Sequence, residues 1–253
     1  MSKNLLGAII LTKNSSETLE DCLSSVDWIN EIIIVDENSS DKTIEIANNY
    51  GATVIETNDT NFSNKRNLGA DKSSSDWILY IDSDEKVTPA LKKEILSSII
   101  NPKFSGYAIP RKNILLGHEM KHGGWWPDYV LRLIKRNNLI SWKGKLHEQP
   151  EIKGEIGKLS SPLIHNSHRS LSTMVEKTNQ WSEIEAELLF KSNHPKMTWW
   201  RFFSVAFREF WYRGIIKLGF LDGSIGIIEI IYQMYSRMIT YAKLWEMQIT
   251  KRK

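Results

Sequence analysis

Two short apolar runs that end on aspartate constrain the fold of this chain most strongly. One is Ile33-Ile34-Val35-Asp36 and the other is Tyr80-Ile81-Asp82-Ser83-Asp84. Both favour β structure, and a buried strand that ends on carboxylates brings charge to the rim of a sheet. Open α/β sheets bind their ligands at that rim. Two aspartates separated by one residue can hold a hard divalent cation, which in turn can hold a diphosphate.

Strand-like and helix-like segments alternate through the first hundred residues. We expect strands at 5–11, 31–35, 53–56 and 77–81, and helical segments at 16–26, 41–50, 64–70 and 88–100. This alternation predicts βαβ units and a mostly parallel sheet. Because the strands are continuously apolar, we expect both faces of the sheet to be covered.

The second half of the chain has a different pattern. Further strands are expected at 107–110, 130–134 and 139–142, and the sequence becomes helical from about Leu171. We therefore predict an α/β domain over residues 1–170, followed by a helical C-terminal region over residues 171–253.

Composition excludes several classes of protein. The 253 residues are 41% apolar and 25% charged, which is typical of a globular protein. A net charge of +3 is too small to indicate nucleic-acid binding. Cys22 is the only cysteine, so neither an intramolecular disulfide nor a cysteine-based zinc site is possible. No run approaches the roughly 20 apolar residues of a spanning helix, and we expect a cytoplasmic protein.

The acidic strand ends allow two interpretations. Asp36 can accept hydrogen bonds from a base or a ribose hydroxyl, but its segment can equally be a loop that caps the next helix. Asp82 and Asp84 repel each other unless a cation or a basic side chain lies near, which favours a metal site over an acidic surface turn.

A basic segment follows the third expected strand. Lys65 and Arg66 lie near a helix start, where an anionic ligand is favoured, although they can also form a solvated basic face. The chain has neither the glycine-rich dinucleotide fingerprint nor a P-loop, which disfavours nicotinamide enzymes and P-loop nucleotidases.

Aromatic residues cluster at two places. Trp125 and Trp126 follow two glycines and can cover the apolar face of an acceptor sugar, or they can be core aromatics. Residues 197–217 mix Trp, Phe and Tyr with Arg and Lys, a composition that favours the membrane–water interface. A helical appendage packed on the catalytic domain and a dimer surface are the alternatives.

Several of these motifs occur in the order found in one known family. The chain resembles the family 2 glycosyltransferases of the GT-A fold, and within them the bacterial lipopolysaccharide-core β-1,4-glucosyltransferases. The matching segments are Ile10-Leu11-Thr12-Lys13-Asn14, residues 35–41, Lys65-Arg66-Asn67-Leu68-Gly69, Asp82-Ser83-Asp84, residues 127–133, His147-Glu148 and Leu163-Ile164-His165. The resemblance implies a Rossmann-like, mostly parallel sheet flanked by helices, with a nucleotide-sugar half over about residues 1–100 and an acceptor half over about 101–170.

The resemblance also implies a role for each matching residue. Thr12 and Asn14 would line the nucleoside pocket, and Asp36 would contact uracil or ribose with Glu37 beside it. Lys65 and Arg66 would help to hold the nucleotide. Asp82 would contact ribose and metal. Asp84 and His165 would be ligands of Mg²⁺ or Mn²⁺, with His147 as the alternative histidine. Asp128 would be the catalytic base, with Glu148 as the runner-up.

These expectations describe an inverting enzyme. It would move a hexose from a nucleotide sugar, UDP-activated, to a lipid-linked or cell-surface glycan such as lipopolysaccharide core, working at the inner face of the cytoplasmic membrane. Two alternatives are a sugar nucleotidyltransferase and a non-catalytic, membrane-associated glycan-binding scaffold. The first usually carries a glycine-rich loop after the first strand, and Thr12-Lys13-Asn14 contains no glycine.

Overall fold

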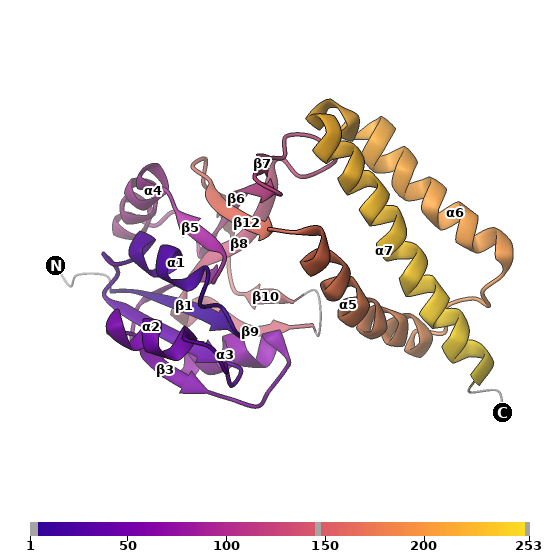
Figure 1. Cartoon of the computed structure of the whole chain (residues 1–253). Coiled ribbons are helices and arrows are strands. Elements are labelled where there is room, and N and C mark those ends of the chain that lie inside the picture. Colours follow the sequence, from indigo (N-terminus) through magenta and orange to yellow (C-terminus); the bar gives the residue numbers. More distant parts are fainter. Residues whose placement is uncertain (1–4, 145–147, 251–253) are drawn as a thin grey trace. The chain divides into compact units, whose positions relative to one another are not determined.

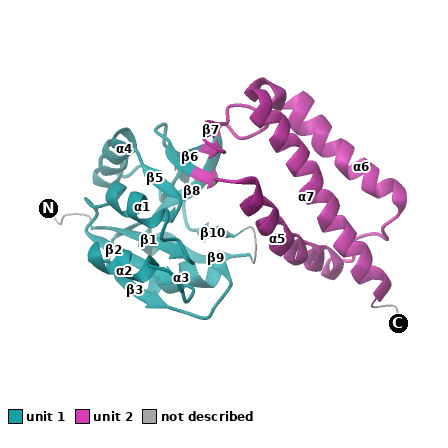
Figure 2. Cartoon of the chain, viewed as in Figure 1, with its two compact units in different colours: residues 1–112, 128–165 teal, residues 113–127, 166–253 magenta. Residues whose placement is uncertain are grey.

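The computed structural model describes residues 5–144 and 148–250. The chain forms two compact units, coloured separately in Figure 2. Residues 1–112 and 128–165 make up the first, which we call the sheet unit. Residues 113–127 and 166–253 make up the second, which we call the helical unit. The predicted domain boundary at residue 170 stays a prediction.

A mixed sheet forms the sheet unit (Figure 1), and its first four strands are parallel. The predicted α/β class and the alternation of strands and helices are confirmed. The order along the sheet is β3 (Thr53–Glu56), β2 (Glu31–Asp36), β1 (Leu6–Thr12), β4 (Trp77–Asp82), β8 (Asp128–Lys135), β6 (Gly106–Leu115), β12 (Leu163–His168) and β5 (Glu85–Val87). Strand β8 pairs with β4 in the antiparallel direction, so the sheet changes from parallel to antiparallel beyond β4.

Short strands complete this architecture. Strands β7 (His118–Glu119) and β11 (Ile156–Lys158) pair with β6 at the margin of the large sheet. A separate two-stranded sheet is formed by β9 (Leu139–Lys143) and β10 (Gln149–Ile152).

The parallel strands bury apolar side chains on both faces, as their continuous apolar runs predict. Ile10 and Ile34 face one core cluster together with buried residues of α1 (Leu19–Ser25), α2 (Thr43–Asn49) and α4 (Pro89–Ile100). Ile9 and Ile33 face a second cluster, which includes Ala70 of α3 (Phe62–Lys72). Because alternate residues of a strand point to opposite faces, the two clusters enclose the sheet.

Local sequence fixes where two of these helices begin. Thr88 caps α4, since its hydroxyl oxygen accepts a hydrogen bond from the backbone N–H of Leu91 at 3.2 Å, and Pro89 occupies the first turn. The side-chain oxygen of Asn61 caps α3 by accepting from the N–H of Ser63 at 2.9 Å. The first turn of α3 therefore has a fixed starting point, from which Lys65 and Arg66 project.

Helix α3 lies unusually close to the sheet. A Cβ atom on Gly69 would come within 2.6 Å of a methyl carbon of Ile9, so the approach requires glycine. The same helix buries two cations, since Lys65 and Arg66 are each only 2% exposed. Buried cations require partners of opposite charge. The carboxylates that pair with Lys65 and Arg66 belong to the candidate site.

The helical unit is built from three long or medium helices and two short turns (Figure 1). They are α5 (Leu171–Lys191), α6 (Trp199–Glu209), the π-helical turn η2 (Phe210–Ile216), the 3₁₀ turn η3 (Gly219–Asp222) and α7 (Gly223–Thr250). Its apolar core is small, with Ala186, Met197 and Leu244 at the centre. Within the described residues, no helix is both long and apolar enough to cross a bilayer.

Candidate active site

The rim where the parallel strands end is the natural position for a ligand site. Thr12 at the end of β1 is in register with Asp36 at the end of β2, and Leu11 is in register with Asp82 at the end of β4. The chain runs from β1 to β2 and β3 on one side, then crosses to β4 on the other side of β1. The strand order therefore reverses at β1 and β4, which is the switch point where open α/β sheets bind ligands.

The carboxylate of Asp36 ties the ends of two strands together. It is fully buried and accepts hydrogen bonds from the hydroxyl of Thr12 at 2.6 Å, from the N–H of Ser39 at 2.7 Å and from the hydroxyl of Ser39 at 2.6 Å. These three donors are neutral, and a carboxylate has about four acceptor positions. Asp36 therefore organises this loop without capping α2, and about one acceptor position is left for a ligand.

Two further predicted nucleotide contacts are engaged in the same loop region. The side-chain oxygen of Asn14 accepts from the N–H of Ser40 at 2.8 Å. Glu37 pairs with Lys13 and, at 2.6 Å, with the ammonium of Lys65. Burial alone would raise the pKa of Glu37, but these two lysines lower it below its usual range. Lys65 is thus a buried counter-ion of Glu37 and not part of a solvated basic face.

Asp82 is held by two arginines at the end of β4. Its Oδ1 lies 2.8 Å from a guanidinium nitrogen of Arg66, and its Oδ2 pairs with Arg132. Burial would raise the pKa of Asp82, but Arg132 and then Arg66 hold it well below its usual range. Correspondingly, burial would lower the pKa of Arg132, whereas Asp82 and Glu85 raise it. Asp82 is therefore a fixed negative charge at the rim.

The arginines extend this ion network to both candidate bases. Arg111 bonds to Oδ2 of Asp128 at 2.6 Å and lies 3.5 Å from Glu85, which is fully buried. Arg66 bonds to Oε1 of Glu148 at 3.1 Å. Four carboxylates and three guanidinium groups thus alternate across this part of the sheet unit.

The predicted metal ligands are only partly assembled. His165 Nε2 lies 3.6 Å from Asp84 Oδ1, so β12 brings an imidazole to the carboxylate that follows β4. Asp82 instead faces the two arginines. Across residues 5–144 and 148–250, no group of three or more His, Cys, Asp or Glu side chains is arranged to hold a metal ion. His147, the alternative histidine, lies outside the described residues.

The two predicted acceptor tryptophans belong to the helical unit and differ from each other. Trp126 is 40% exposed. Trp125 is partly buried, with the guanidinium of Arg213 over its ring at 5.6 Å. The loop that carries both is fastened by buried Asp222, which accepts from the N–H of His122 at 2.8 Å. Trp126 is thus the residue of the pair that offers a ring face to a ligand.

Sequence reasoning missed three members of the ion network, namely Glu85, Arg111 and Arg132. A signal for one of them exists, because Arg132 interrupts the apolar run Val130-Leu131-Arg132-Leu133-Ile134. A charge inside a buried strand requires a partner of opposite sign. Nothing local identifies that partner, which lies on another strand.

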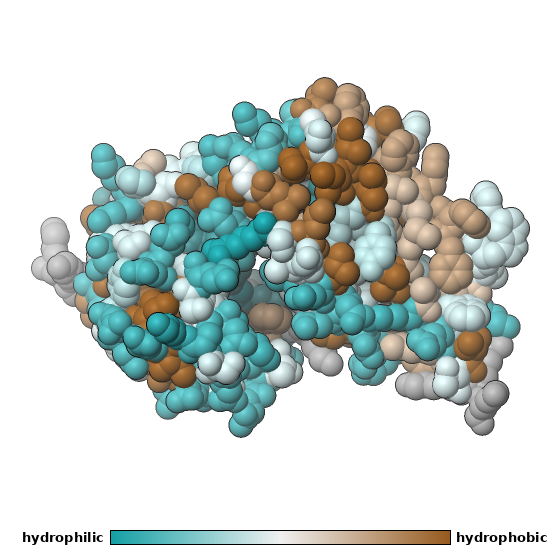
Figure 3. Space-filling model, viewed as in Figure 1, coloured by the Kyte–Doolittle hydropathy of each residue, from teal (hydrophilic) through white to brown (hydrophobic). Residues whose placement is uncertain are grey.

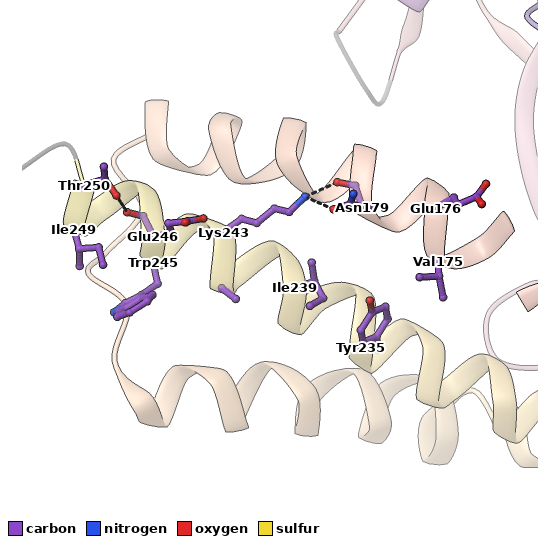
Figure 4. Close-up of a pocket in the computed structure, with 11 residues that line it drawn as sticks. Val175, Glu176, Asn179, Tyr235, Ile239, Lys243, Trp245, Glu246, Ile249 and Thr250 are labelled. Carbon is purple, nitrogen blue, oxygen red and sulfur yellow. Dashed lines mark hydrogen bonds between the residues drawn. The ribbon is translucent and has the colours of Figure 1, made fainter. Parts of the chain in front are cut away.

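A separate groove of about 740 Å³ lies between α5 and α7 in the helical unit (Figure 4). Its lining includes Tyr235, Trp245 and Lys243. The ammonium of Lys243 donates to the side-chain oxygen of Asn179 at 3.0 Å, across the groove. The strand-end carboxylates of the sheet unit are not part of this groove, so it is not the candidate active site.

Comparison with known proteins identifies the family. The family model described as "Glycosyl transferase family 2" matches residues 8–151, which is more than half of the chain. The chain belongs to glycosyltransferase family 2. The matched segment contains the strand ends, Arg66, Asp82, Arg132 and both candidate bases, so the ion network lies within the family's own region of the chain.

Similarity to individual glycosyltransferases extends over nearly the whole chain. An uncharacterized glycosyltransferase of Rickettsia typhi is 26% identical and covers 98% of this chain and 89% of that protein. The lipopolysaccharide core biosynthesis glycosyltransferase LpsC of Rhizobium meliloti is 24% identical and covers 97% of this chain and 94% of that protein. The solved structure of S. aureus TarS 1–349 in complex with UDP-GlcNAc has a TM-score of 0.50 at 13% identity and covers 98% of this chain and 91% of that chain. The predicted GT-A fold is thereby confirmed.

Proposed function

We propose that this family 2 glycosyltransferase is an inverting hexosyltransferase. It transfers a hexose from a UDP-sugar to a hydroxyl group of a lipid-linked or cell-surface glycan, such as lipopolysaccharide core, at the inner face of the cytoplasmic membrane. The observation that carries the proposal is the meeting of charged side chains at the switch point of the sheet, with Asp82 fixed by two arginines and Asp84 beside His165. The UDP-GlcNAc in the TarS structure and the name of LpsC support the donor and acceptor classes.

Donor binding uses the strand ends. Asp36 keeps about one acceptor position for a ribose or base group, and Thr12 and Asn14 shape the loop around it. Arg66 contributes positive charge beside Asp82, where the diphosphate of a nucleotide bound across the switch point would lie.

Two residues fit a divalent cation. A carboxylate oxygen and an imidazole nitrogen 3.6 Å apart, on Asp84 and His165, suit Mn²⁺ or Mg²⁺, with the remaining ligands coming from the donor's phosphates and water. When bound, such a cation supplies positive charge to the departing diphosphate. Asp82 lies nearby as a fixed negative charge. The sequence predicts that Asp82 is itself a metal ligand, and we propose this smaller role instead.

Asp128 is the proposed base, and Glu148 is the alternative. A base at this position takes the proton from the acceptor hydroxyl, which attacks the anomeric carbon opposite the leaving group and so inverts its configuration. Arg111 holds Oδ2 of Asp128 and fixes the orientation of the carboxylate. Asp128→Asn should reduce kcat far more than Glu148→Gln, and the reverse result would exchange their roles.

The experiment that tests the proposal is a comparison of Asp84→Asn with the wild-type protein. UDP-sugar turnover in the presence of Mn²⁺ should fall by roughly a thousandfold or more, since charge stabilisation of the leaving group is lost. A thermal-shift titration with UDP and Mn²⁺ should show a smaller increase in Tm for this variant.

Asp27→Asn is the matched control, because Asp27 is an exposed carboxylate that precedes the start of β2, at the other end of that strand from Asp36. It should keep both turnover and the Mn²⁺-dependent shift. If Asp84→Asn kept full turnover and its Mn²⁺ requirement, the proposed site would be wrong. A wild-type chain that neither binds UDP nor hydrolyses any UDP-sugar would favour the non-catalytic scaffold.

A further inference from the structure

Helix α6 presents a row of exposed aromatic side chains, which contact one another along the helix. Trp199, Phe203 and Phe207 are 72%, 64% and 61% exposed. Each is four residues from the next, and Trp211 continues the row into η2. In Figure 3, the most hydrophobic colouring lies over the region where Figure 1 places the start of α7, and tan and pale residues lie over α6. Contiguous apolar surface of this kind marks an interaction site in a soluble domain.

The exposed row is not the core-facing side of α6. At about 100° per residue, Phe203 lies about 60° around the helix from Ala206, about 100° from Phe202 and about 160° from Val205, so the row lies beside the buried side of α6 and not on it. Val205 and Ala206 are buried, and Phe202 packs into the core cluster that contains Leu244 of α7. The fold of the helical unit is thus satisfied without the aromatic row, which leaves that row available to a partner.

Positive charge borders the aromatic row. Lys196 and Arg208 each precede a tryptophan of the row by three residues, Arg201 lies two turns before Arg208 on the same side of α6, and Lys217 follows the row. Residues 196–221 contain five basic residues and one acidic residue. That single acid, Glu209, is paired with Arg213 at 3.1 Å and with Arg237 at 3.5 Å. The remaining charge is complementary to an anionic surface.

We propose that the aromatic face of α6 and η2 lies in the interfacial layer of an anionic lipid bilayer. Tryptophan and phenylalanine side chains enter the boundary between headgroups and acyl chains, while the flanking arginines and lysines contact lipid phosphates. The helix has 11 residues, which suits an orientation in the plane of the membrane. The inference depends on the proposed function in one respect, which is that the membrane would present the lipid-linked acceptor.

Charge distinguishes lipid from a second copy of the chain as the occupant. Two copies paired through this face by twofold symmetry would bring their basic borders toward each other, which costs free energy. An anionic bilayer neutralises the same border. The observed charge therefore favours lipid.

Co-sedimentation of the full chain with vesicles tests the proposal. Binding to vesicles that contain phosphatidylglycerol should exceed binding to phosphatidylcholine vesicles and should weaken as salt is added. The triple variant Trp199→Ser/Phe203→Ser/Phe207→Ser should lose roughly tenfold or more in binding to either lipid. The variant Arg201→Gln/Arg208→Gln should lose binding only to phosphatidylglycerol vesicles and should show a weaker salt dependence.

The control is Ile100→Ser/Ile140→Ser, which removes two exposed apolar side chains from the sheet unit. This control should bind vesicles as the wild-type chain does, and all variants should keep the wild-type Tm. Absence of vesicle binding by the full chain at low salt would overturn the proposal, as would unchanged binding of the triple variant. A dimer that is lost in the triple variant, with no vesicle binding, would identify a second copy as the occupant.

The two proposals fail independently. UDP-sugar hydrolysis without vesicles should be unchanged in the triple variant, whereas Asp84→Asn should lose hydrolysis and still bind vesicles. A chain that binds vesicles without hydrolysing UDP-sugars would retain the membrane face and refute the catalytic proposal.

Discussion

The sheet unit and the helical unit surround a carboxylate in opposite ways. In the sheet unit, Asp82 is met by the guanidinium groups of Arg66 and Arg132, which hold its pKa well below the usual range despite the effect of burial. In the helical unit, Glu229 on α7 is only 3% exposed, and its Oε1 accepts a hydrogen bond from Gln233 at 2.7 Å. Its Oε2 has no hydrogen-bond partner within the described residues.

The difference appears in the pKa of Glu229. Burial raises that pKa to about 7, while Gln233 and Arg213 offset only part of the shift. Asp82 is therefore ionised throughout the physiological range, whereas Glu229 changes charge near neutral pH. Two guanidinium groups thus keep Asp82 charged, whereas Glu229 lacks a cation close enough to do the same.

Removal of Arg132 should have the largest effect on stability. Arg132→Met leaves Asp82 and the fully buried Glu85 without their shared partner. We expect the free energy of unfolding to fall by about 3 kcal/mol, the lower end of the range for a broken buried ion pair, because Arg66 and Arg111 remain. Urea denaturation at neutral pH measures this loss.

The pH dependence of that loss follows from the depressed pKa of Asp82. A carboxyl with a lowered folded pKa stabilises the fold above its unfolded pKa of about 4, and this contribution disappears as the pH falls through the folded value. The difference between wild type and Arg132→Met should therefore be largest at neutral pH and shrink in acid. Arg136→Met, a change at a partly exposed arginine, is the control. Equal losses in the two variants would show that Asp82 does not depend on Arg132.

Glu229→Gln should stabilise the protein, and the gain should grow as the pH rises from about 4.5 to about 7. A carboxyl with a raised folded pKa favours the fold below its unfolded value, and this advantage is lost as the pH rises through about 7. At about pH 8 the variant should gain up to about 3 kcal/mol, and the gain should vanish at about pH 4, below the unfolded pKa. Tm measured across this pH range gives the comparison.

Glu246→Gln changes an exposed glutamate on the same helix and serves as the control. Its Tm should follow the wild-type curve at every pH. A gain for Glu229→Gln that is the same at both pH values would mean that packing, and not ionisation, separates the variant from the wild type.

The strand ends of the sheet unit could be predicted from the sequence, since local signals specify them. Ile33–Asp36 and Tyr80–Asp82 are apolar runs that end on acids, and parallel pairing through β1 places Asp36 and Asp82 at the same rim. The start of α4 was equally local, because Thr88 and Pro89 are a cap and a first-turn residue.

The partners of these residues could not be predicted in the same way. Arg132 meets Asp82 only because β8 pairs with β4 in an antiparallel register that brings Leu133 opposite Leu79. Trp125 and Trp126 are neighbours in sequence, yet their environments differ because Arg213, far along the chain, covers one ring. Long-range register and tertiary packing decide such contacts, and no local pattern encodes them.

The smallest effect is expected at Asp36, whose charge is met by neutral donors alone. Asp36→Asn keeps one side-chain oxygen but disrupts the bonds from Thr12 and Ser39, so we expect a loss of about 2 kcal/mol in the free energy of unfolding. Thr12→Val removes a single donor and should cost about 1 kcal/mol by the same measurement. A loss at Asp36 as large as that of Arg132→Met would break the comparison, because it would require a cationic partner for Asp36 that the three neutral donors do not provide.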